Sequence, residues 1–417
     1  MPSKPQAAAP RQVRPVRLAY LVSHPIQYQA PLLRRIAQQP GIDLTVFFGS
    51  DFSVRGYRDA GFGVSFKWDI PLVDGYKHVF LPRLRDGHDV NFATPLNRGI
   101  VACLRSHPAQ PPFDALWVHG YATANALHGI LAARALGIPV LLRAEGWLRD
   151  RDRSPARRIL KKIFFAGLAP MIDAVLPIGT LNAQYWRHYF GENIPQFLMP
   201  YAIDNAYFAE RTAEARTARA ELQAELRLDP SRPVILFASK LQSRKHCDHL
   251  IEAYTRLAPS PGIDPQPYLL IVGDGDRRSA LEHQAAATGL SSIRFCGFRN
   301  QSELPRFFDL ASVFVLPSRH EPWGLIVNEV MAAARPAIVS SDVGCAPDLI
   351  DDQVNGCVFP VGDIAALATA LRRVLDPPGV AEAMGARARE RIQTWSFTED
   401  IAALRQALSF VAPWFEP

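Results

Sequence analysis

The 417-residue sequence contains no apolar run that is long enough to span a bilayer. Residues 1–13 are basic and rich in proline and alanine, and they lack the apolar core of a signal peptide. We expect this stretch to be a disordered tail outside the fold. These absences predict a cytoplasmic protein, either free in the cytoplasm or at the cytoplasmic face of the inner or plasma membrane.

Cysteine is scarce, and its spacing indicates no cross-link or zinc site. The five cysteines are scattered without a CxxC pair, so we expect reduced cytosolic thiols. Two DxD patterns, Asp150/Asp152 and Asp274/Asp276, have no further histidine or carboxylate beside them, and we expect no metal site. The second pattern alternates with glycine and is typical of a turn. No GxGxxG fingerprint follows the first predicted strand, which counts against a nicotinamide enzyme.

Length and composition indicate a two-domain globular protein. The chain is longer than a typical single core, and it is 48% hydrophobic and 21% charged. Its net charge of +6 and isoelectric point near 9.1 are mildly basic. Such a charge suits anionic substrates or an anionic membrane surface, and by itself it does not argue for nucleic acid. We expect no nucleic-acid partner.

Strands and helices alternate in the first half of the chain. The pattern predicts strands at residues 16–22 and 42–48, with a helix between them, and further strands at 115–118 and around 139–146. This alternation favours a parallel α/β sheet. Residues 51–97 are irregular and aromatic, which suits either a binding lid or a poorly patterned hairpin packed on the sheet.

Polar side chains follow the predicted strands of this first half. His24, Gln27 and Tyr28 stand in the first turn, where His24 either satisfies a loop or faces a substrate. His119 ends the strand at 115–118, and Arg143 and Glu145 end the next strand. Ligands of α/β proteins bind beyond the carboxyl ends of the strands. A role as a strand-end cap would explain His119 by itself. The presence of Arg143 and Glu145 on the same edge of the sheet favours a binding site.

Residues 149–165 predict a cationic amphipathic helix. The stretch from Arg149 to Lys162 holds seven Arg or Lys against Asp150 and Asp152, and its apolar side includes Ile159 and Phe164. One interpretation is a helix that lies on anionic lipid. The other is a core-packed helix with a solvated basic face.

The second half repeats the alternation and predicts a second doubly wound sheet. A strand at 234–238 leads directly into Lys240, Arg244 and Lys245, whose charges can grip a phosphate at the ligand edge. A strand over VFVLP then precedes the segment from Ser318 to Ser341. After residue 363 the chain is expected to be wholly helical.

The segment from Ser318 to Ser341 brings two carboxylates to the start of a helix. Glu321 and Glu329 bracket Gly324, and an apolar helix is expected from about Leu325. Free amides at such a helix start favour a negative group such as phosphate. Either the two carboxylates merely stabilise the positive end of the helix, or they are polar acceptors beside an anion site.

Residues 234–363 resemble the C-terminal half of family 4 retaining glycosyltransferases, the glycosyl transferases group 1. The resemblance rests on LLIVGDGD, on GFRNQSELPRFFDLASVFVLPS and on the Glu-(seven residues)-Glu spacing within HEPWGLIVNEVMAAARPAIVSS. SHPIQYQAPL and WDIPLVDGY in the first half are similar to a subset of these enzymes. The family implies the α/β fold GT-B, with two Rossmann-like domains facing across a cleft. On this chain the domains would be residues 14–205 and 206–394, and residues 395–417 would form a helix that crosses back to the first domain.

The resemblance also implies roles for individual residues. Glu321 would contact the donor sugar and Glu329 the ribose, whereas Lys240 and Lys245 would match a basic pair that is usually Arg then Lys. Lys at the first position keeps the charge and loses a bidentate donor. The remaining assignments are the diphosphate at the amides of Gly324, Leu325 and Ile326, the base near Gly297 and Phe298, and the donor sugar above His119. The family's glycine-rich first loop is replaced here by His24-Pro25-Ile26-Gln27, so the acceptor side, to which we assign His24, Gln27, Tyr28, Arg143 and Glu145, departs from the pattern.

The activity implied is hexosyl transfer from a UDP- or GDP-sugar to a glycan or lipid-linked acceptor, with no resident cofactor. The setting implied is cell-surface polysaccharide synthesis. No carboxylate stands out as a nucleophile, so we expect front-face transfer with retention, in which Lys240, Lys245 and helix amides stabilise the leaving diphosphate. The alternatives are a nucleotide-sugar epimerase of the same architecture and a non-catalytic sugar-nucleotide or glycan-binding scaffold.

Overall fold

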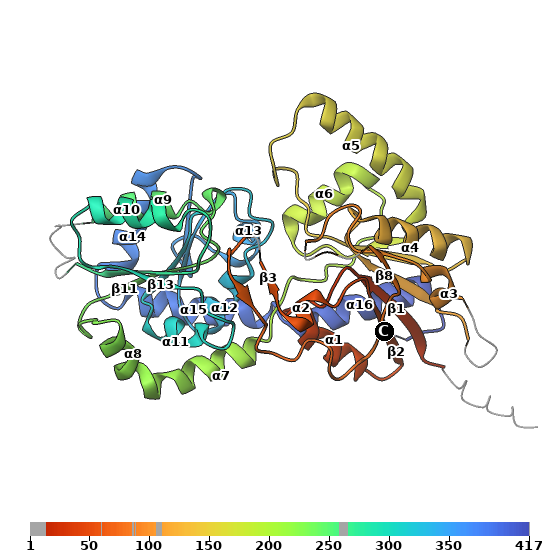
Figure 1. Ribbon diagram of the computed structural model, residues 1–417, viewed down its shortest axis with the longest axis horizontal. Coiled ribbons are helices and arrows are strands. Elements are labelled where there is room, and N and C mark those ends of the chain that lie inside the picture. The colour runs from red at the N-terminus through yellow and green to blue at the C-terminus, as the bar shows by residue number, and fades with distance from the viewer. Residues whose placement is uncertain are drawn as a thin grey trace, which may run out of the picture.

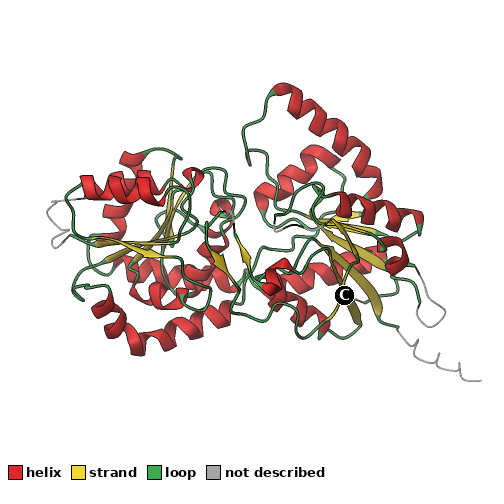
Figure 2. Cartoon of the chain, in the orientation of Figure 1, coloured by secondary structure: helices red, strands yellow, loops and turns green. Residues whose placement is uncertain are grey.

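The computed structural model describes residues 14–59, 61–85, 87, 89–105, 111–257 and 266–416. They form two α/β lobes, each built on a six-stranded parallel sheet. The lobes lie side by side, and helices cover both faces of each sheet (Figures 1 and 2). The two doubly wound domains predicted from the sequence are therefore confirmed.

The first sheet has the strand order β10-β9-β8-β1-β2-β5. Its strands are β1 (Val16–Val22), β2 (Ile42–Phe48), β5 (Lys77–Phe80), β8 (Ala115–His119), β9 (Val140–Arg143) and β10 (Ala174–Val175). The two predicted strands at 16–22 and 42–48 coincide with β1 and β2. Central parallel strands are covered on both faces, which is why these strands read as nearly continuous apolar runs.

Helices α1 (Gln29–Ala37), α3 (Ile100–Leu104), α4 (Ala124–Ala135), α5 (Pro155–Leu168) and α6 (Thr180–Phe190) belong to the first lobe. Thr123 caps α4 by accepting a hydrogen bond from the Ala126 amide, and Ser154 caps α5 in the same way. Figure 1 shows α5 standing out from the lobe, where it packs on α6. The predicted cationic helix thus begins after the polar stretch 149–153.

The irregular segment 51–97 combines both structures considered for it. It holds α2 (Phe52–Arg55), β3 (Tyr57–Arg58), β4 (Ser65–Phe66), β5, β6 (Arg83–Arg85) and β7 (Leu96–Asn97). β5 joins the edge of the sheet beside β2, whereas the β3–β4 hairpin lies between the two lobes (Figure 1). β5 escaped the sequence analysis because, as an exposed edge strand, it lacks a buried apolar pattern.

The second sheet repeats the same topology, with the order β13-β12-β11-β14-β15-β16. Its strands are β11 (Val234–Ala238), β12 (Tyr268–Val272), β13 (Ile293–Gly297), β14 (Val313–Leu316), β15 (Ala337–Ser340) and β16 (Gly356–Phe359). In both sheets the strand order reverses beside the first strand, between β1 and β8 and between β11 and β14. The short edge strand β16 was not predicted.

Helices α7 (Asn205–Ala215), α8 (Arg219–Glu225), α9 (Cys247–Thr255), α10 (Arg278–Ala287), α11 (Leu304–Leu310), α12 (Leu325–Ala332), α13 (Ala346–Leu349), α14 (Ile364–Leu375) and α15 (Val380–Gln393) belong to the second lobe. α7 begins at Asn205, where the first of the two expected domains ends. The Asp204 side chain accepts a hydrogen bond from the Tyr207 amide and so provides the N-cap that starts this helix.

The last helix, α16 (Phe397–Val411), packs against α1 of the first lobe (Figure 1). A capping box between Ser396 and Glu399 starts it. Its inner face buries Phe397, Leu404 and Leu408 in the apolar cluster that also holds the inner face of α1. The chain therefore crosses between the lobes twice, before α7 and again before α16.

Candidate functional site

A cleft of about 460 Å³ lies between the two lobes. It opens where the strand order of both sheets reverses, because the loops after β1, β11 and β14 line it. The predicted site residues that line it are His24, Gln27, Tyr28, Glu145, Lys240, Lys245, Phe298, Glu321, Gly324, Leu325, Ile326 and Glu329. His119, Arg143 and Gly297 do not line it. Residues from both lobes thus meet in one cleft.

Glu321 and Lys245 form a largely buried ion pair on the second-lobe wall. The Lys245 ammonium donates to the Glu321 carboxylate, and Arg244 Nη1 lies 3.5 Å from the same oxygen. Burial lowers the pKa of Lys245, although the Glu321 charge acts in the opposite direction. The cluster presents two cations and one carboxylate to the cleft, so it can bind an anionic group and accept from a hydroxyl.

Glu329 is a buried carboxyl group with an unused oxygen. Its side chain comes from α12 and is only 5% exposed, and no described residue hydrogen-bonds its Oε2. Burial raises the pKa of this carboxyl to about 8. A buried polar atom without a partner is costly to the folded protein. Because Glu329 lines the cleft, a ligand with hydroxyl donors can supply the missing hydrogen bonds.

The first turn of α12 lines the cleft. The first amides of a helix lack partners within the helix, so Gly324, Leu325 and Ile326 line a natural anion site. Gly324 adopts φ +92°, and a Cβ there would meet Leu316 Cδ2 at 3.0 Å and Val343 Cγ1 at 3.2 Å. Glycine is therefore required at the point where the loop after β14 turns into α12.

Lys240 reaches across the cleft to the first lobe. Its ammonium donates to both carboxylate oxygens of Asp59, at 2.8 and 2.9 Å. Burial tends to raise the pKa of Asp59, but hydrogen bonds from Lys240 and from the Phe62 and Gly61 amides outweigh it and hold the pKa below its ordinary value. The ion pair joins the two walls of the cleft beside the first lobe's hairpin.

The β3–β4 hairpin closes the cleft with aromatic side chains. Phe298 packs against Phe66 and Phe62, with ring centroids 4.6 and 4.8 Å apart. Asn300 donates to the Lys67 carbonyl at 2.8 Å, which ties the loop after β13 to the hairpin. The hairpin thus covers one end of the cleft. Gly297 lies behind this layer, where its carbonyl accepts from the Gly273 amide.

His119 lies behind Glu145, which separates it from the cleft. The buried Gln29 amide donates to His119 Nδ1 at 3.0 Å, which leaves Nε2 facing Glu145 Oε1 at 3.8 Å. Burial tends to raise the pKa of Glu145, but the neighbouring His119 and the hydrogen bond from the Tyr201 hydroxyl outweigh it and hold the pKa of this carboxyl below its ordinary value. His119 and Glu145 therefore lie side by side as a polar pair, at a separation too long for a direct hydrogen bond.

The first loop of the chain supplies the opposite wall of the cleft. His24, Gln27 and Tyr28 all line it, and the His24 ring packs at 4.5 Å on Phe52. Burial, together with the neighbouring His119, lowers the pKa of His24 to about 4. At neutral pH His24 is therefore an uncharged group that can donate or accept a hydrogen bond.

Arg143 lies beneath the cleft. Its side chain is 2% exposed, and Nη1 lies 3.4 Å from Asp400 of α16. Nη2 donates to the Pro200 carbonyl at 2.9 Å. The structure thus places Arg143 between β9 and the returning C-terminal helix, away from the position expected of an acceptor ligand.

One acidic residue of each DxD pattern is paired with an arginine. Asp274 accepts from Arg278 at 2.8 Å, and Asp150 accepts from Arg153. Within the described part of the chain, no group of three or more His, Cys, Asp or Glu side chains is arranged to hold a metal ion.

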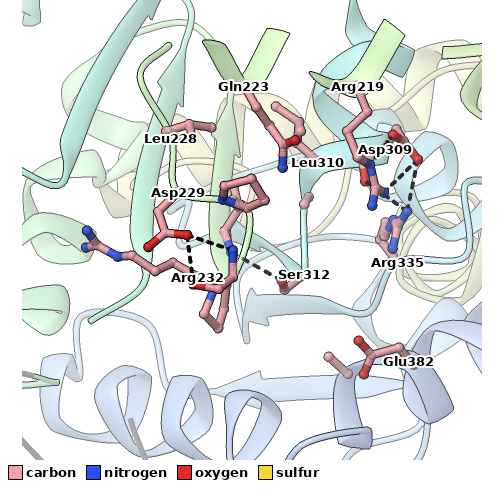
Figure 3. Close-up of a pocket in the computed structure, with 16 residues that line it drawn as sticks. Arg219, Gln223, Leu228, Asp229, Arg232, Asp309, Leu310, Ser312, Arg335 and Glu382 are labelled. Atoms are coloured by element: carbon pink, nitrogen blue, oxygen red, sulfur yellow. Dashed lines mark hydrogen bonds and ion pairs between the residues drawn. The ribbon is translucent and has the colours of Figure 1, made fainter. Parts of the chain in front are cut away.

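A second pocket, of about 290 Å³, lies at the opposite, amino-terminal edge of the second sheet (Figure 3). The buried Asp309 carboxylate there is bound by Arg219 at 2.7 Å and lies 3.6 Å from Arg335. The buried Asp309 charge is thus compensated by arginines in a structural network.

Helix α5 exposes its apolar residues. Ile159, Leu160 and Ile163 are 59%, 66% and 64% exposed, and Phe164 is 39% exposed. Only Phe165 and Leu168 of this helix are buried. The helix therefore packs on the core through Phe165 and Leu168 and leaves the rest of its apolar side exposed. No helix among the described residues is long and apolar enough to cross a membrane.

A known family model matches the second lobe. Residues 218–391, less than half of the chain, match the model of the glycosyl transferases group 1. This stretch contains Lys240, Lys245, Glu321 and Glu329, and its match to the glycosyl transferases group 1 is the resemblance that the sequence motifs predicted.

Two curated relatives illustrate the extent of the similarity. The alpha-D-kanosaminyltransferase of Streptomyces kanamyceticus is 34% identical over 187 residues, which cover 44% of this chain and 47% of the relative. A D-inositol 3-phosphate glycosyltransferase of Nocardioides sp. is 27% identical over 319 residues, covering 71% of this chain and 68% of the relative. The match to the kanosaminyltransferase thus spans less than half of that protein's length.

Solved structures share the architecture of nearly the whole chain. A glycosyltransferase from Rickettsia africae superposes with a TM-score of 0.72 at 14% identity, over 95% of this chain and 98% of its own. HepE from Anabaena, solved with UDP and glucose, gives a TM-score of 0.70 at 16% identity, over 94% and 99%. These likenesses confirm the GT-B fold predicted from the sequence.

The sequence analysis missed several residues of the cleft. Asp59, Tyr57 and Trp68 come from the irregular hairpin segment, and Tyr201 comes from the crossing between the lobes. The aromatic residues concentrated at 57–68 were the only signal available, because no motif accompanies them. Gln29 was not identified because it lies in the first turn of α1, where a polar residue is expected on the exposed surface of a helix.

Proposed function

We propose that the protein is a hexosyltransferase that moves a sugar from a nucleotide-sugar donor to an acceptor bound in the same cleft. The observation that carries this proposal is Glu329, a buried carboxyl whose Oε2 has no partner among the described residues and which lines the cleft one helix turn from the α12 amides. A ribose offers two adjacent hydroxyl donors, and the diphosphate beside it suits the helix start. A sugar nucleotide joins these two groups in one molecule.

The charges around the donor support a mechanism for its cleavage. Departure of the nucleoside diphosphate builds negative charge on phosphate oxygens, and Lys240, Lys245 and the α12 amides are preorganised to stabilise it. Glu321 would accept from hydroxyls of the donor sugar. We propose front-face transfer with retention, without a resident metal or other cofactor, in which the leaving phosphate takes the proton of the acceptor hydroxyl.

The proposed donor is a UDP-sugar, with a GDP-sugar as the alternative. HepE from Anabaena, which shares the fold, was solved with UDP and glucose and also with UDP-glucose. Phe298 and the hairpin aromatics Phe62 and Phe66 form an apolar end of the cleft where a flat base can stack. We place the base at this end and the sugar toward Glu321 and Glu145.

The exposed face of α5 supports a membrane location for the acceptor. Ile159, Leu160 and Ile163 are more than half exposed, and Arg157, Arg158 and Lys162 flank them. Charge complementarity favours anionic lipid. We therefore propose peripheral binding at the cytoplasmic face of a membrane and a glycan or lipid-linked acceptor used in cell-surface polysaccharide synthesis. Vesicles with 30% phosphatidylglycerol should sediment the protein but not its Ile163→Glu variant, and equal sedimentation would refute the contact.

A donor panel tests the proposed activity. Thermal shifts with UDP-, GDP-, ADP- and dTDP-sugars should single out one nucleotide, because a ligand that binds only the native state raises its stability. With that donor, Glu321→Gln should lower turnover about a hundredfold or more, as expected for a group that contacts the reacting sugar, while Glu252→Gln on the surface of α9 should leave it unchanged. Full activity of Glu321→Gln would refute the assignment.

Two rival functions predict different results in the same assays. A nucleotide-sugar epimerase would convert its donor without any acceptor, which chromatography of the sugar after incubation reveals. A scaffold would bind the sugar nucleotide without turnover over a broad acceptor panel. Release of free nucleoside diphosphate that depends on an acceptor distinguishes transfer from both.

A further inference from the structure

A second crevice lies between the lobes, on the other side of the donor-site wall. It measures about 610 Å³, and its charged lining consists of three histidines, the arginines Arg149, Arg151, Arg158 and Arg319, and the carboxylates Asp152 and Asp342. We call it the basic crevice. Among the lining residues, four guanidinium groups face two carboxylates, and one further carboxylate, that of Asp150, lies 3.9 Å from Arg151 Nε. The donor cleft and the mechanism above use none of these charges.

The two carboxylates neutralise only part of the lining. Asp152 lies 3.2 Å from Arg319 Nη2 and 3.4 Å from His320 Nε2. Asp342 is nearly buried, and its Oδ1 lies 4.0 Å from Arg149 Nη2. Within the described part of the chain, no carboxylate lies within 4 Å of the Arg158 guanidinium. The crevice is therefore an open, multiply cationic site, which suits the several oxygens of a phosphate group.

The basic crevice shares a wall with the donor cleft. Segments 244–246 and 319–321 contribute residues to both cavities, and the Arg319 amide donates to the Arg244 carbonyl at 2.7 Å. The Glu321 amide in turn donates to the Asp342 carbonyl at 3.1 Å. A ligand in the crevice would thus lie one layer of backbone from the residue assigned to the donor sugar.

The crevice also adjoins the exposed face of α5. Arg158 lines the crevice from the first turns of that helix, and Ile159 follows it directly with 59% of its surface exposed. In Figure 1 the N-terminal end of α5 lies on the side of the helix nearer the second lobe. An apolar chain on α5 would therefore bring a phosphate at its end to the crevice.

We propose that the basic crevice binds a phosphate or diphosphate group of the acceptor, so that the acceptor is a phosphorylated molecule. This inference rests on the proposed transferase function and adds the chemical class of the second substrate. The phosphate can belong to a soluble sugar phosphate or to a lipid carrier, since both present the same oxygens to the arginines. In either case the crevice holds the anionic end, while a hydroxyl of the acceptor reaches over the shared wall to the donor sugar.

Calorimetry with inorganic diphosphate tests the crevice on the full chain. Saturating UDP, or the nucleotide selected by the donor panel, first occupies the donor cleft so that only the second site remains. The loaded protein should bind diphosphate, and the double variant Arg149→Gln/Arg319→Gln should bind it at least tenfold more weakly. Both side chains are largely exposed, so the fold should tolerate the change. Arg373→Gln, on the exposed face of α14, is the matched control and should bind as the unchanged protein does.

The nucleotide titration separates failure of the crevice from failure of the donor site. Absence of nucleotide binding would refute the proposed function. Nucleotide binding without diphosphate binding, or equal diphosphate binding by the double variant, would overturn the crevice alone. Phosphatidylcholine vesicles carrying farnesyl diphosphate then identify the source: tighter binding than to inorganic diphosphate, lost in Ile163→Glu, supports a lipid carrier, and equal binding supports a soluble phosphate.

Discussion

Asp59 of the first lobe holds Lys240 of the second lobe through two hydrogen bonds, although 181 positions separate them in the sequence. Lys240 is one of the two lysines assigned to the leaving diphosphate. The Asp59 carboxylate therefore binds a cation that the donor needs, next to the hairpin that covers the cleft. A donor phosphate must share or displace this carboxylate.

The first prediction concerns that competition. Asp59→Asn removes the competing charge, and an ion pair of this kind contributes up to about 1 kcal/mol. We expect nucleoside diphosphate to bind up to about fivefold more tightly to the variant in calorimetry. Asp74→Asn changes an exposed carboxylate in the same segment and should have no effect. Weaker binding to Asp59→Asn would show that Asp59 helps to hold the donor.

The second prediction follows from the pKa of Glu329, which burial raises to about 8. The free protein therefore carries a neutral Glu329 at pH 7, whereas ribose hydroxyls favour the carboxylate that accepts from them. Donor binding should release a proton, and nucleotide affinity should rise from pH 6 to pH 8 and level off above it. Calorimetry in two buffers of different ionisation enthalpy measures this release.

Glu329→Gln provides the control for that proton. The variant should bind nucleotide more weakly and without proton release, whereas Glu252→Gln should behave as the unchanged protein. Because the folded pKa lies above the unfolded value, the free protein should also lose stability as pH rises from about 4.5 to 8. Proton uptake on binding would contradict the assignment of Glu329 to ribose.

The third prediction concerns the turn before α12. Gly324→Ala adds a Cβ at 3.0 Å from Leu316 in a backbone conformation of φ +92°, so the helix start must shift. We expect nucleotide affinity to fall about tenfold, because the amides of α12 leave their positions. Gly191→Ala is the matched control, since Gly191 has φ +93° with nothing within 4 Å of its Cβ position. Equal losses of affinity in the two variants would show backbone strain alone to be responsible.

The fourth prediction separates structural from binding roles of Arg143. Asp400→Asn leaves the buried Arg143 guanidinium without its counter-ion, and breaking such a pair typically costs about 3–5 kcal/mol. The loss should be smaller at pH 8 than at pH 5, because burial, only partly offset by Arg143, raises the pKa of Asp400 to about 7, so the unchanged protein itself loses stability as pH rises whereas the Asn side chain does not titrate. Urea unfolding at pH 5 and pH 8 measures it, with Glu390→Gln as a surface control. Unchanged nucleotide affinity is expected, since neither residue lines the cleft.

The sequence was sufficient to predict the two sheets and the second-lobe wall of the cleft. β1, β2 and β11 carry apolar runs that only buried parallel strands require, and the polar residues after them fall at the ligand edge for topological reasons. The spacing of Glu321 and Glu329 lies within one loop and one helix, so a local pattern contains it. Local sequence patterns therefore predicted the half of the site that the second lobe contributes.

The opposite wall depends on contacts that no local pattern encodes. The pairing of Asp59 with Lys240 arises only when the lobes close on each other, and the β3–β4 strands are two residues long. The place of His119 behind Glu145 likewise depends on Gln29 and on Tyr201 from the crossing between the lobes. Tertiary packing, which propensity does not describe, decided these positions.

The return of α16 to the first lobe links the two ends of the chain during synthesis. Leu404 and Leu408 complete the same apolar cluster as Leu33 of α1, so the first lobe lacks part of its core until α16, which follows the whole second lobe, has been made. Loss of α16 would therefore unfold the first lobe rather than the second lobe, which directly precedes this helix in the sequence. The first lobe to be translated is thus the last to be finished.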